Sequence, residues 1–391
     1  MVLSEKDPRY KQCSLTVMDN IADPGIHFDE NGVSNYVHEF NQAFRKRVFQ
    51  GEQGKKLIEK KIKEIKKDGE GKQYDCIVGV SGGVDSTYVA YLAKQYNLRP
   101  LVVHFDNGWN SELAVKNIEN IITTLGYELY TYVINWDEFR DLQRAFFKAG
   151  VVDIELLTDH AIISTLYKLA RQYKIHYILA GNNIVTENIL PKAWIWDKSD
   201  WLNIKTIHNQ YGNTKLKTFP HMSFWRNLIN TYFFKLESIH ILDYFPYNKQ
   251  EVKEVIKKEL GWRDYGGKHY ESIFTRFYQA YVLPVKFGID KRKAHLSTLI
   301  CSGQITKAQA EEELKEPLYE PSKLKEDKEF VLKKLGFSEQ EFDQLMNDKP
   351  VPHQSYANYN GRHWKYYFKL LDSTRSFRRK YFSKVKPQLN P

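Results

Sequence analysis

Cysteine is scarce in this sequence: Cys13, Cys76 and Cys301 lie far apart among 391 residues. This count excludes a disulfide framework as the main support of the fold and is typical of a reducing cytoplasm. Long apolar runs are absent too, since no stretch approaches the roughly 20 residues that a membrane span needs, and residues 1–8 contain no apolar signal region. We therefore expect a cytoplasmic protein without a membrane partner.

Two catalytic features are missing from the sequence, and their absence limits the reactions that the chain could catalyse by itself. The Walker pattern GxxxxGK[ST] does not occur, which excludes a phosphate loop of that type. No cysteine lies in a nucleophile-elbow context and position 2 is Val2, so the chain offers no evident nucleophile for glutamine hydrolysis. With 42% hydrophobic residues the chain is globular, and it is long enough for roughly two or three domains.

The most informative stretch that is present runs from residue 74 to 87, YDCIVGVSGGVDST. Its apolar run, Cys76 to Val80, predicts a buried parallel strand, and a helical pattern begins near Asp85. Two glycines between them allow a sharp turn, and the first N–H groups of a helix favour an anion. The stretch therefore predicts a phosphate-binding loop. Its expected ligand contacts are Ser81, Gly82, Gly83, Val84, Asp85, Ser86 and Thr87.

The string SGGVDS resembles the PP-loop of the ATP pyrophosphatases, which cleave ATP between its α and β phosphates and adenylate an oxygen. Strands and helices alternate from residue 75 to 180, which predicts the same βαβ topology. We expect an α/β fold: a doubly wound parallel sheet of the PP-loop ATP pyrophosphatase (adenine nucleotide α-hydrolase-like) type. The expected segments are an N-terminal turn-rich module (1–50), a basic helix and linker (51–72), the PP-loop ATP-binding domain (73–250) and a helical C-terminal substrate or partner region (251–391).

Two further predicted strands end in polar residues. Open parallel sheets bind ligands at the carboxyl ends of their strands, and the PP-loop resemblance places adenosine there as well. The strands expected at 100–105 and 176–180 therefore predict nucleotide contacts. These candidates are His104, Phe105, Asp106, Gly181, Asn182, Thr186 and Glu187.

Carboxylates cluster just before a helix expected at 161–173. Carboxylates near a triphosphate commonly hold Mg²⁺, and we place Asp85 and Asp159 on the metal side of ATP. Asp159 equally suits the N-cap of that helix. Substrate contacts are expected from this cluster, which comprises Asp153, Glu155, Asp159 and His160.

Cations, a histidine and acids surround Gly266-Gly267 in the stretch from Gly261 to Phe277. This composition suits recognition of an anionic substrate, while the plainer interpretation is a charged loop that turns at Gly267. We expect Arg263 and Glu271 to contact the substrate. The predicted catalytic residues are Asp85, Lys268, His269 and Arg276.

Most of residues 10–310 resembles the N-acetyl sugar amidotransferases of lipopolysaccharide and surface-polysaccharide biosynthesis. The segments that are similar include DPGIHFDENGVSN near the N-terminus and FGIDKRKAHLS at 287–297. That family carries two CxxC pairs suited to one tetrahedral zinc. Here only Cys13 remains, with Thr16, Ser34 and Val37 at the other three positions, so we expect no structural zinc.

The resemblance implies an ATP-dependent, AMP-forming amidotransferase with ATP and Mg²⁺ as cofactors. It would adenylate the acetamido oxygen of an N-acetylated, nucleotide-linked sugar and replace it with ammonia, which gives an acetamidino sugar. A separate glutaminase subunit is the implied source of the ammonia.

The net charge of +10 permits an alternative. A basic surface at 55–72 and 362–386 would suit a PP-loop tRNA-modifying enzyme, such as a thiolase or a lysidine synthetase. Both stretches also fit amphipathic helices, and thiolation generally needs paired cysteines that this chain lacks. A third interpretation is an inactive scaffold, against which the intact SGGVDS argues. Nucleic acid is therefore not expected as a partner.

Two segments after residue 190 complete the expectations. Trp194, Trp196 and Trp201 are expected to pack, with a platform for a sugar face as the functional alternative. A helix is expected over residues 222–236.

Overall fold

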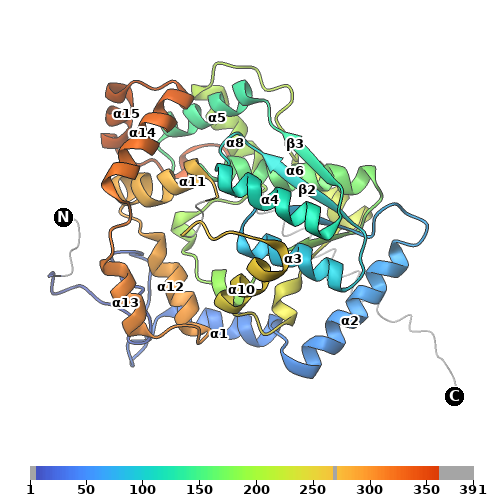
Figure 1. Ribbon diagram of the computed structural model, residues 1–391. Coiled ribbons are helices and arrows are strands. Elements are labelled where there is room, and N and C mark those ends of the chain that lie inside the picture. The colour runs from blue at the N-terminus through green and yellow to red at the C-terminus, as the bar shows by residue number, and fades with distance from the viewer. Residues whose placement is uncertain (1–5, 267–270, 361–391) are drawn as a thin grey trace, which may run out of the picture.

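The computed structural model describes residues 6–266 and 271–360. Its centre is a five-stranded sheet in the order β3-β2-β1-β4-β5, in which every neighbouring pair is parallel (Figure 1). The strands are β1 (Cys76–Val80), β2 (Pro100–Asp106), β3 (Leu129–Val133), β4 (Tyr177–Ala180) and β5 (Glu237–His240). The predicted fold class is confirmed, and the predicted span of β1 matches the observed one.

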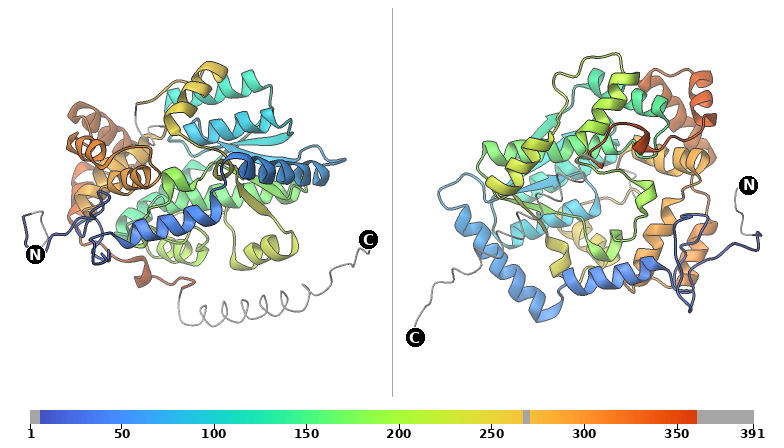
Figure 2. Two further views of the ribbon diagram at one scale, coloured as in Figure 1. Left: turned by 90° about the horizontal axis from the view of Figure 1, so that it is seen from below. Right: turned by 180° about the vertical axis from the view of Figure 1, so that it is seen from behind.

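Helices cover both faces of the sheet (Figure 2). Alternate side chains of β1 enter different clusters, because successive residues of a strand point to opposite faces. Val78 packs with α3 (Val84–Gln95), α4 (Glu112–Leu125) and α10 (Lys249–Leu260), whereas Ile77 packs with Leu169 of α6 (Leu156–Gln172). Burial on both faces explains why β1 reads as a continuous apolar run.

The other helices lie before, between and after these elements. Before α10 they are α1 (Asn35–Arg47), α2 (Gly51–Asp68), α5 (Trp136–Ala149), α7 (Ile184–Glu187), η1 (Lys192–Trp194), α8 (Trp201–Tyr211), α9 (Phe224–Leu228), η2 (Ile229–Phe233) and η3 (Ile241–Tyr244). After α10 they are α11 (Ile273–Phe277), η4 (Tyr278–Phe287), α12 (Lys291–Cys301), α13 (Lys307–Lys315), α14 (Pro321–Leu335), α15 (Glu339–Asn347) and η5 (His353–Ser355). No helix among the residues described is long and apolar enough to cross a membrane.

Local sequence signals fix the ends of α4. The Ser111 side chain accepts a hydrogen bond from the Ala114 N–H, which satisfies one free amide at the start of the helix. Gly126 ends the helix in the left-handed conformation, with φ of 66°. Both signals are visible in the sequence, as Ser111 and Gly126.

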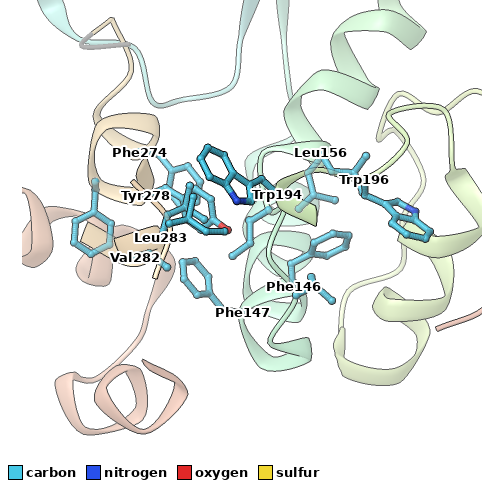
Figure 3. Close-up of a cluster of buried hydrophobic side chains, with 14 of the residues drawn as sticks. Phe146, Phe147, Leu156, Trp194, Trp196, Phe274, Tyr278, Val282 and Leu283 are labelled. Carbon is cyan, nitrogen blue, oxygen red and sulfur yellow. The ribbon is translucent and has the colours of Figure 1, made fainter. Parts of the chain in front are cut away.

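The largest core lies beside the sheet and joins α5 and α6 to the C-terminal helices (Figure 3). Phe146 and Phe147 of α5 contribute to it, as do Phe274 of α11 and Tyr278 of η4. Two of the three tryptophans expected to pack, Trp194 and Trp196, belong to this core and are 2% and 8% exposed. The third, Trp201, is half-buried and stacks on His221 with ring centroids 4.5 Å apart.

The N-terminal module rests on α12 and α13. Asp19 is fully buried and pairs with Lys293, and Val17 packs with Leu296 and Ala310. Residues 26–28 form no strand, and Phe28 makes only an isolated bridge with Ser34. The turns and these contacts hold the module.

Three of the four positions discussed for zinc lie together in this module. Cys13, Thr16 and Ser34 are fully buried, and the Ser34 N–H donates to Cys13 Sγ at 3.3 Å. Burial opposes ionisation of the Cys13 thiol, but hydrogen bonds from Ser34 and Thr16 outweigh it and lower the pKa. Val37 is buried as well.

Two helix predictions are wrong at their boundaries. The helix expected over 222–236 is α9 followed by a π-helical turn, and β5 begins at Glu237. Only four residues form β5 and two of them are exposed, so it has neither the length nor the alternation that identifies a strand. The helix expected from 161 is α6, which starts at Leu156. The aromatic tail at 364–382 lies outside the described residues.

Candidate functional site

The sheet order reverses between β1 and β4, and such a switch point is where open α/β sheets bind ligands. The turn Ser81–Gly83 follows β1 at this point and α3 begins at Val84. Gly181, at the end of β4, lies so close that a Cβ there would approach the Asp85 Cβ to 3.3 Å. The phosphate loop predicted from sequence therefore lies in the crevice of the sheet.

Gly82 gives the loop its shape. Its φ is +79°, and a Cβ at this position would meet the Ala114 carbonyl oxygen at 2.6 Å. Only glycine avoids both the backbone strain and the collision. Its own carbonyl accepts a hydrogen bond from Trp262 Nε1 at 2.8 Å, so α10 and its following residues fix the loop from outside the βαβ unit.

The three hydroxyls of the loop divide into two kinds. Ser81 Oγ and Ser86 Oγ lie 3.2 Å apart at the accessible side of the loop. Thr87 is fully buried and donates to the Gly83 carbonyl at 2.6 Å. The structure therefore places Ser81 and Ser86 where phosphate would lie, whereas Thr87 stabilises the first turn of α3.

Two carboxylates flank the loop around a tyrosine that sequence reasoning missed. The Tyr247 hydroxyl donates to Asp85, and burial together with the charges of Asp85 and Glu187 raises the pKa of Tyr247 far above its usual value. Tyr247 follows β5, so its position at this edge could not be seen while β5 itself was unrecognised. Asp85 and Glu187 fit Mg²⁺, which usually takes one or two carboxylates together with phosphate oxygens.

A second tyrosine that was missed lies over the loop. A Cβ placed on Gly83 would lie 3.4 Å from the Tyr265 hydroxyl and 3.8 Å from Glu271 Oε1. Both residues belong to the connection between α10 and α11. The structure thus brings the predicted residue Glu271 to the loop. Lys268 and His269 lie outside the described residues.

A cavity of about 560 Å³ lies between α4, the end of β2 and the first half of β3. Two residues predicted to contact the nucleotide, His104 and Asp106, line this cavity. His104 Nδ1 lies 3.1 Å from the Val80 carbonyl, and its Nε2 lies 3.1 Å from Asn110 Nδ2. Phe105 points to the other face and stacks on Tyr132, so the strand's alternation removes it from the cavity.

The residues after β4 differ in their exposure. Asn182 is accessible and its Nδ2 lies 3.5 Å from Glu187 Oε2. Thr186 is 1% exposed, and both its N–H and its hydroxyl donate to Asn183 Oδ1 at the start of α7. Glu187 and Asn182 therefore line the crevice, while Thr186 stabilises the turn that presents them.

Carboxylates at the start of α6 form ion pairs with two lysines. Lys198 Nζ lies 2.7 Å from Asp153 Oδ2 and 3.1 Å from Asp159 Oδ2. Lys291 of α12 pairs with Glu155 Oε2 at 2.9 Å. Because α6 runs back toward the amino ends of the strands, its start lies at the same edge of the sheet as the loop.

The Asp159 side chain is 47% exposed. Desolvation by the surrounding protein raises its pKa, against the opposing charge of Lys198. The N-cap role considered for Asp159 is wrong, since α6 begins three residues earlier. Lys198 already supplies a cation to this carboxylate, which favours Glu187 over Asp159 as the second Mg²⁺ ligand.

His160 supports this cluster from behind. It is fully buried, its Nδ1 donates to the Lys198 carbonyl at 2.7 Å, and its Nε2 accepts from the Met222 N–H at 3.2 Å. Burial lowers its pKa to about 4, so the ring is neutral. His160 therefore positions the Lys198 backbone, and the direct substrate contact predicted for it does not fit this geometry.

The two arginines are placed differently from the prediction. The Arg276 side chain is 10% exposed and its guanidinium pairs with Asp327 at 2.5 Å, which joins α11 to α14. The structure therefore gives this predicted catalytic residue a structural ion pair. Arg263 is exposed, and its backbone N–H and carbonyl form hydrogen bonds with the Asn117 side chain.

Two family models match separate parts of the chain. Residues 53–187 match the NAD synthase family, and residues 271–371 match the C-terminal domain of LPS biosynthesis protein WbpG-like proteins. The uncharacterized protein MJ1599 of Methanocaldococcus jannaschii is 24% identical over 274 residues, which are 68% of this chain and 80% of that protein.

Two solved structures are also similar. NMN synthetase from Francisella tularensis has 14% identity and a TM-score of 0.28, over 53% of this chain and 87% of that one. NH3-dependent NAD synthetase from Campylobacter jejuni, solved with a nitrate ion, has 18% identity and a TM-score of 0.30, over 53% of this chain and 86% of that one. The loop, the sheet and the two family matches agree with one another. The chain combines a PP-loop nucleotide-binding domain of the NAD synthase type, matched at residues 53–187, with a WbpG-like C-terminal domain of lipopolysaccharide biosynthesis, matched at residues 271–371.

Proposed function

We propose that this protein is an ATP-dependent, AMP-forming amidotransferase that acts on an N-acetylated, nucleotide-linked sugar. The proposal rests on one observation: Glu155, at the start of α6 in the PP-loop domain, is held by Lys291 and Gln279 of the WbpG-like domain. The two domains thus build one polar cluster at the edge of the sheet where the phosphate loop lies. A nucleotide site and a surface-polysaccharide domain that share a cluster favour activation of a sugar by ATP.

The proposed reaction has two steps. The acetamido oxygen attacks the α-phosphorus of ATP, and the bond to the bridging oxygen breaks so that pyrophosphate leaves. Ammonia then adds to the activated carbon, the C–O bond breaks, AMP departs with its electrons and a proton is lost. The product is an acetamidino group.

The residues of the loop stabilise the charge that develops in the first step. The N–H groups at the start of α3 and the hydroxyls of Ser81 and Ser86 face the position of the phosphates. Mg²⁺, when bound, would neutralise charge on the leaving pyrophosphate, and Asp85 and Glu187 are the side chains that would hold it. His104 and Asp106 line the cavity proposed for the nucleoside.

Asp159 is the group proposed to orient the sugar. Its carboxylate is half-exposed beside Lys198, and an ionised carboxylate accepts hydrogen bonds from hydroxyl or amide N–H groups. Lys198 holds it in place from the α7–α8 connection. A sugar bound there would lie at the same sheet edge as the α-phosphate.

The ammonia would come from a separate glutaminase subunit. A glutamine-hydrolysing cysteine must be accessible and ionise readily. Cys13 and Cys76 are fully buried, and burial raises the pKa of Cys301 to about 12. These environments do not suit a nucleophile, which supports an external source of ammonia.

The test measures AMP and pyrophosphate released from ATP with ammonium present, across UDP-linked N-acetylated sugars and bulk tRNA. Sugar-dependent AMP release, with a product in which NH replaces oxygen, is the expected result. AMP release that requires tRNA would overturn the proposal in favour of an RNA-modifying enzyme. Absence of turnover with both, even after a glutaminase is added, would indicate a scaffold.

A further inference from the structure

Tyr265 is a side chain that lies over the phosphate loop from outside the βαβ unit. Its hydroxyl is 3.4 Å from the position that a Cβ on Gly83 would take, and it lies close enough to the Val84 backbone for that N–H to lower its pKa. Val84 is the first residue of α3, so this N–H is one of those that a bound phosphate would use. A phosphate on the loop must therefore meet this hydroxyl.

Two neighbours hold the Tyr265 ring in place. Trp262 contacts it edge to face with ring centroids 5.5 Å apart, and the same indole donates to the Gly82 carbonyl at 2.8 Å. At the far end of the connection, the Glu271 carbonyl accepts from the Ser111 N–H at 2.8 Å. These contacts hold Trp262 and Glu271, on either side of Tyr265 in the sequence, against the nucleotide-binding domain.

The hydroxyl retains its proton. Burial, with the charges of Glu271 and Asp85, raises the pKa of Tyr265 well above its usual value. A neutral phenol beside the Val84 N–H still has its own O–H to donate. Hydrogen bonds to a charged acceptor are about twice as strong as neutral ones, so a phosphate oxygen is the preferred partner for both groups.

We propose that Tyr265 is a phosphate-binding residue of the nucleotide site, whose hydroxyl donates to the β–γ pyrophosphate portion of ATP alongside the N–H groups of the loop. The inference rests on the proposed ATP site and adds a ligand from the α10–α11 connection. It gives that connection a direct part in nucleotide binding. The string SGGVDS cannot reveal this residue, because it lies about 180 positions later in the chain.

The test compares Tyr265→Phe with the wild-type protein by calorimetric titration with pyrophosphate, ATP and adenosine. Loss of one hydrogen bond to a charged group predicts a fall in pyrophosphate and ATP affinity of about tenfold or more, with adenosine affinity unchanged. Tyr127→Phe is the matched control, since it removes a buried hydroxyl from the same side of the sheet without a contact to the loop. It is expected to bind all three ligands like the wild type.

Unchanged or tighter pyrophosphate binding by Tyr265→Phe would overturn the inference, and tighter binding would mean that the hydroxyl blocks the site. A wild-type protein that binds neither ATP nor pyrophosphate would overturn the inference together with the proposed function. If the wild-type protein binds both ligands but releases no AMP with any of the sugars tested, the proposed function alone would be overturned. Thermal unfolding of both variants checks that they remain folded.

Discussion

The Tyr247 hydroxyl donates a hydrogen bond to the Asp85 carboxylate, which joins the first turn of α3 to the segment that follows β5. The two residues are 162 positions apart and meet at the switch point of the sheet. A phenol that cannot ionise holds the carboxylate in one orientation without neutralising it. Tyr247 therefore orients the carboxylate that is proposed to hold a cation on the phosphates.

The first prediction concerns this carboxylate. Asp85→Asn removes the charge while it preserves the size of the side chain, so the Mg²⁺ concentration needed for half-maximal AMP formation should rise at least about tenfold. A Mg²⁺ titration of AMP release measures this. Asp137→Asn, an exposed carboxylate in the first turn of α5, is the control and should leave the titration unchanged. An unaltered Mg²⁺ requirement in Asp85→Asn would exclude a metal role.

The second prediction concerns the shape of the loop. Gly82→Ala meets both a positive φ of +79° and a carbonyl oxygen at 2.6 Å, so it should abolish measurable ATP binding. Gly126→Ala is its control, because its φ is +66° but nothing lies within 4 Å of the added Cβ. The control should lose about 1–2 kcal/mol of unfolding free energy, because alanine is strained in the left-handed conformation. It should bind ATP normally. Urea unfolding and ATP titration of both variants test this, and normal ATP binding by Gly82→Ala would contradict it.

The site residues that lie in or directly after the predicted strands could be predicted from the sequence. Those that reach the loop from distant parts of the chain could not. The loop, Asp85 and the ends of β2 and β4 follow from short strand-turn-helix signals that each lie within a few residues. Three aromatic residues are brought to the loop by β5 and α10, which precede them in the chain: Tyr247, Trp262 and Tyr265. Because β5 has only four residues, its sequence contains no periodic pattern that would predict a strand. Arg276 shows the converse error, since a charged residue near a Gly-Gly pair proved to be the buried partner of Asp327. Composition identifies charge but does not identify its partner.

The third prediction concerns the cluster that both domains build. Lys291→Met removes the ammonium that pairs with Glu155, so we expect the KM for the sugar to rise about tenfold while ATP affinity stays unchanged. Lys315→Met is the matched control, because its pair with Glu312 is exposed on α13. Steady-state kinetics with varied sugar, together with an ATP titration, separate the two effects. Equal losses in sugar and ATP binding would point to a general structural defect instead.

The fourth prediction concerns pH. His160 is buried and neutral, and its pKa is lowered from 6.5 to about 4 in the folded protein. The unfolded chain therefore binds a proton between pH 6.5 and 4 that the folded protein does not, so stability must fall as the pH falls through this window. The shift corresponds to roughly 3 kcal/mol of unfolding free energy if it is titrated completely.

His160→Gln removes this titration and should flatten the fall in stability. Urea unfolding at pH 7 and pH 4.5 measures the loss for each protein, and the variant should lose less than the wild type by about 2–3 kcal/mol. His27→Gln, which changes an exposed histidine of the N-terminal module, should lose as much as the wild type. The comparison is made within each protein, because His160→Gln also alters the support of Lys198 at both pH values. Equal losses in the wild type and His160→Gln would mean that this histidine is protonated in the folded protein.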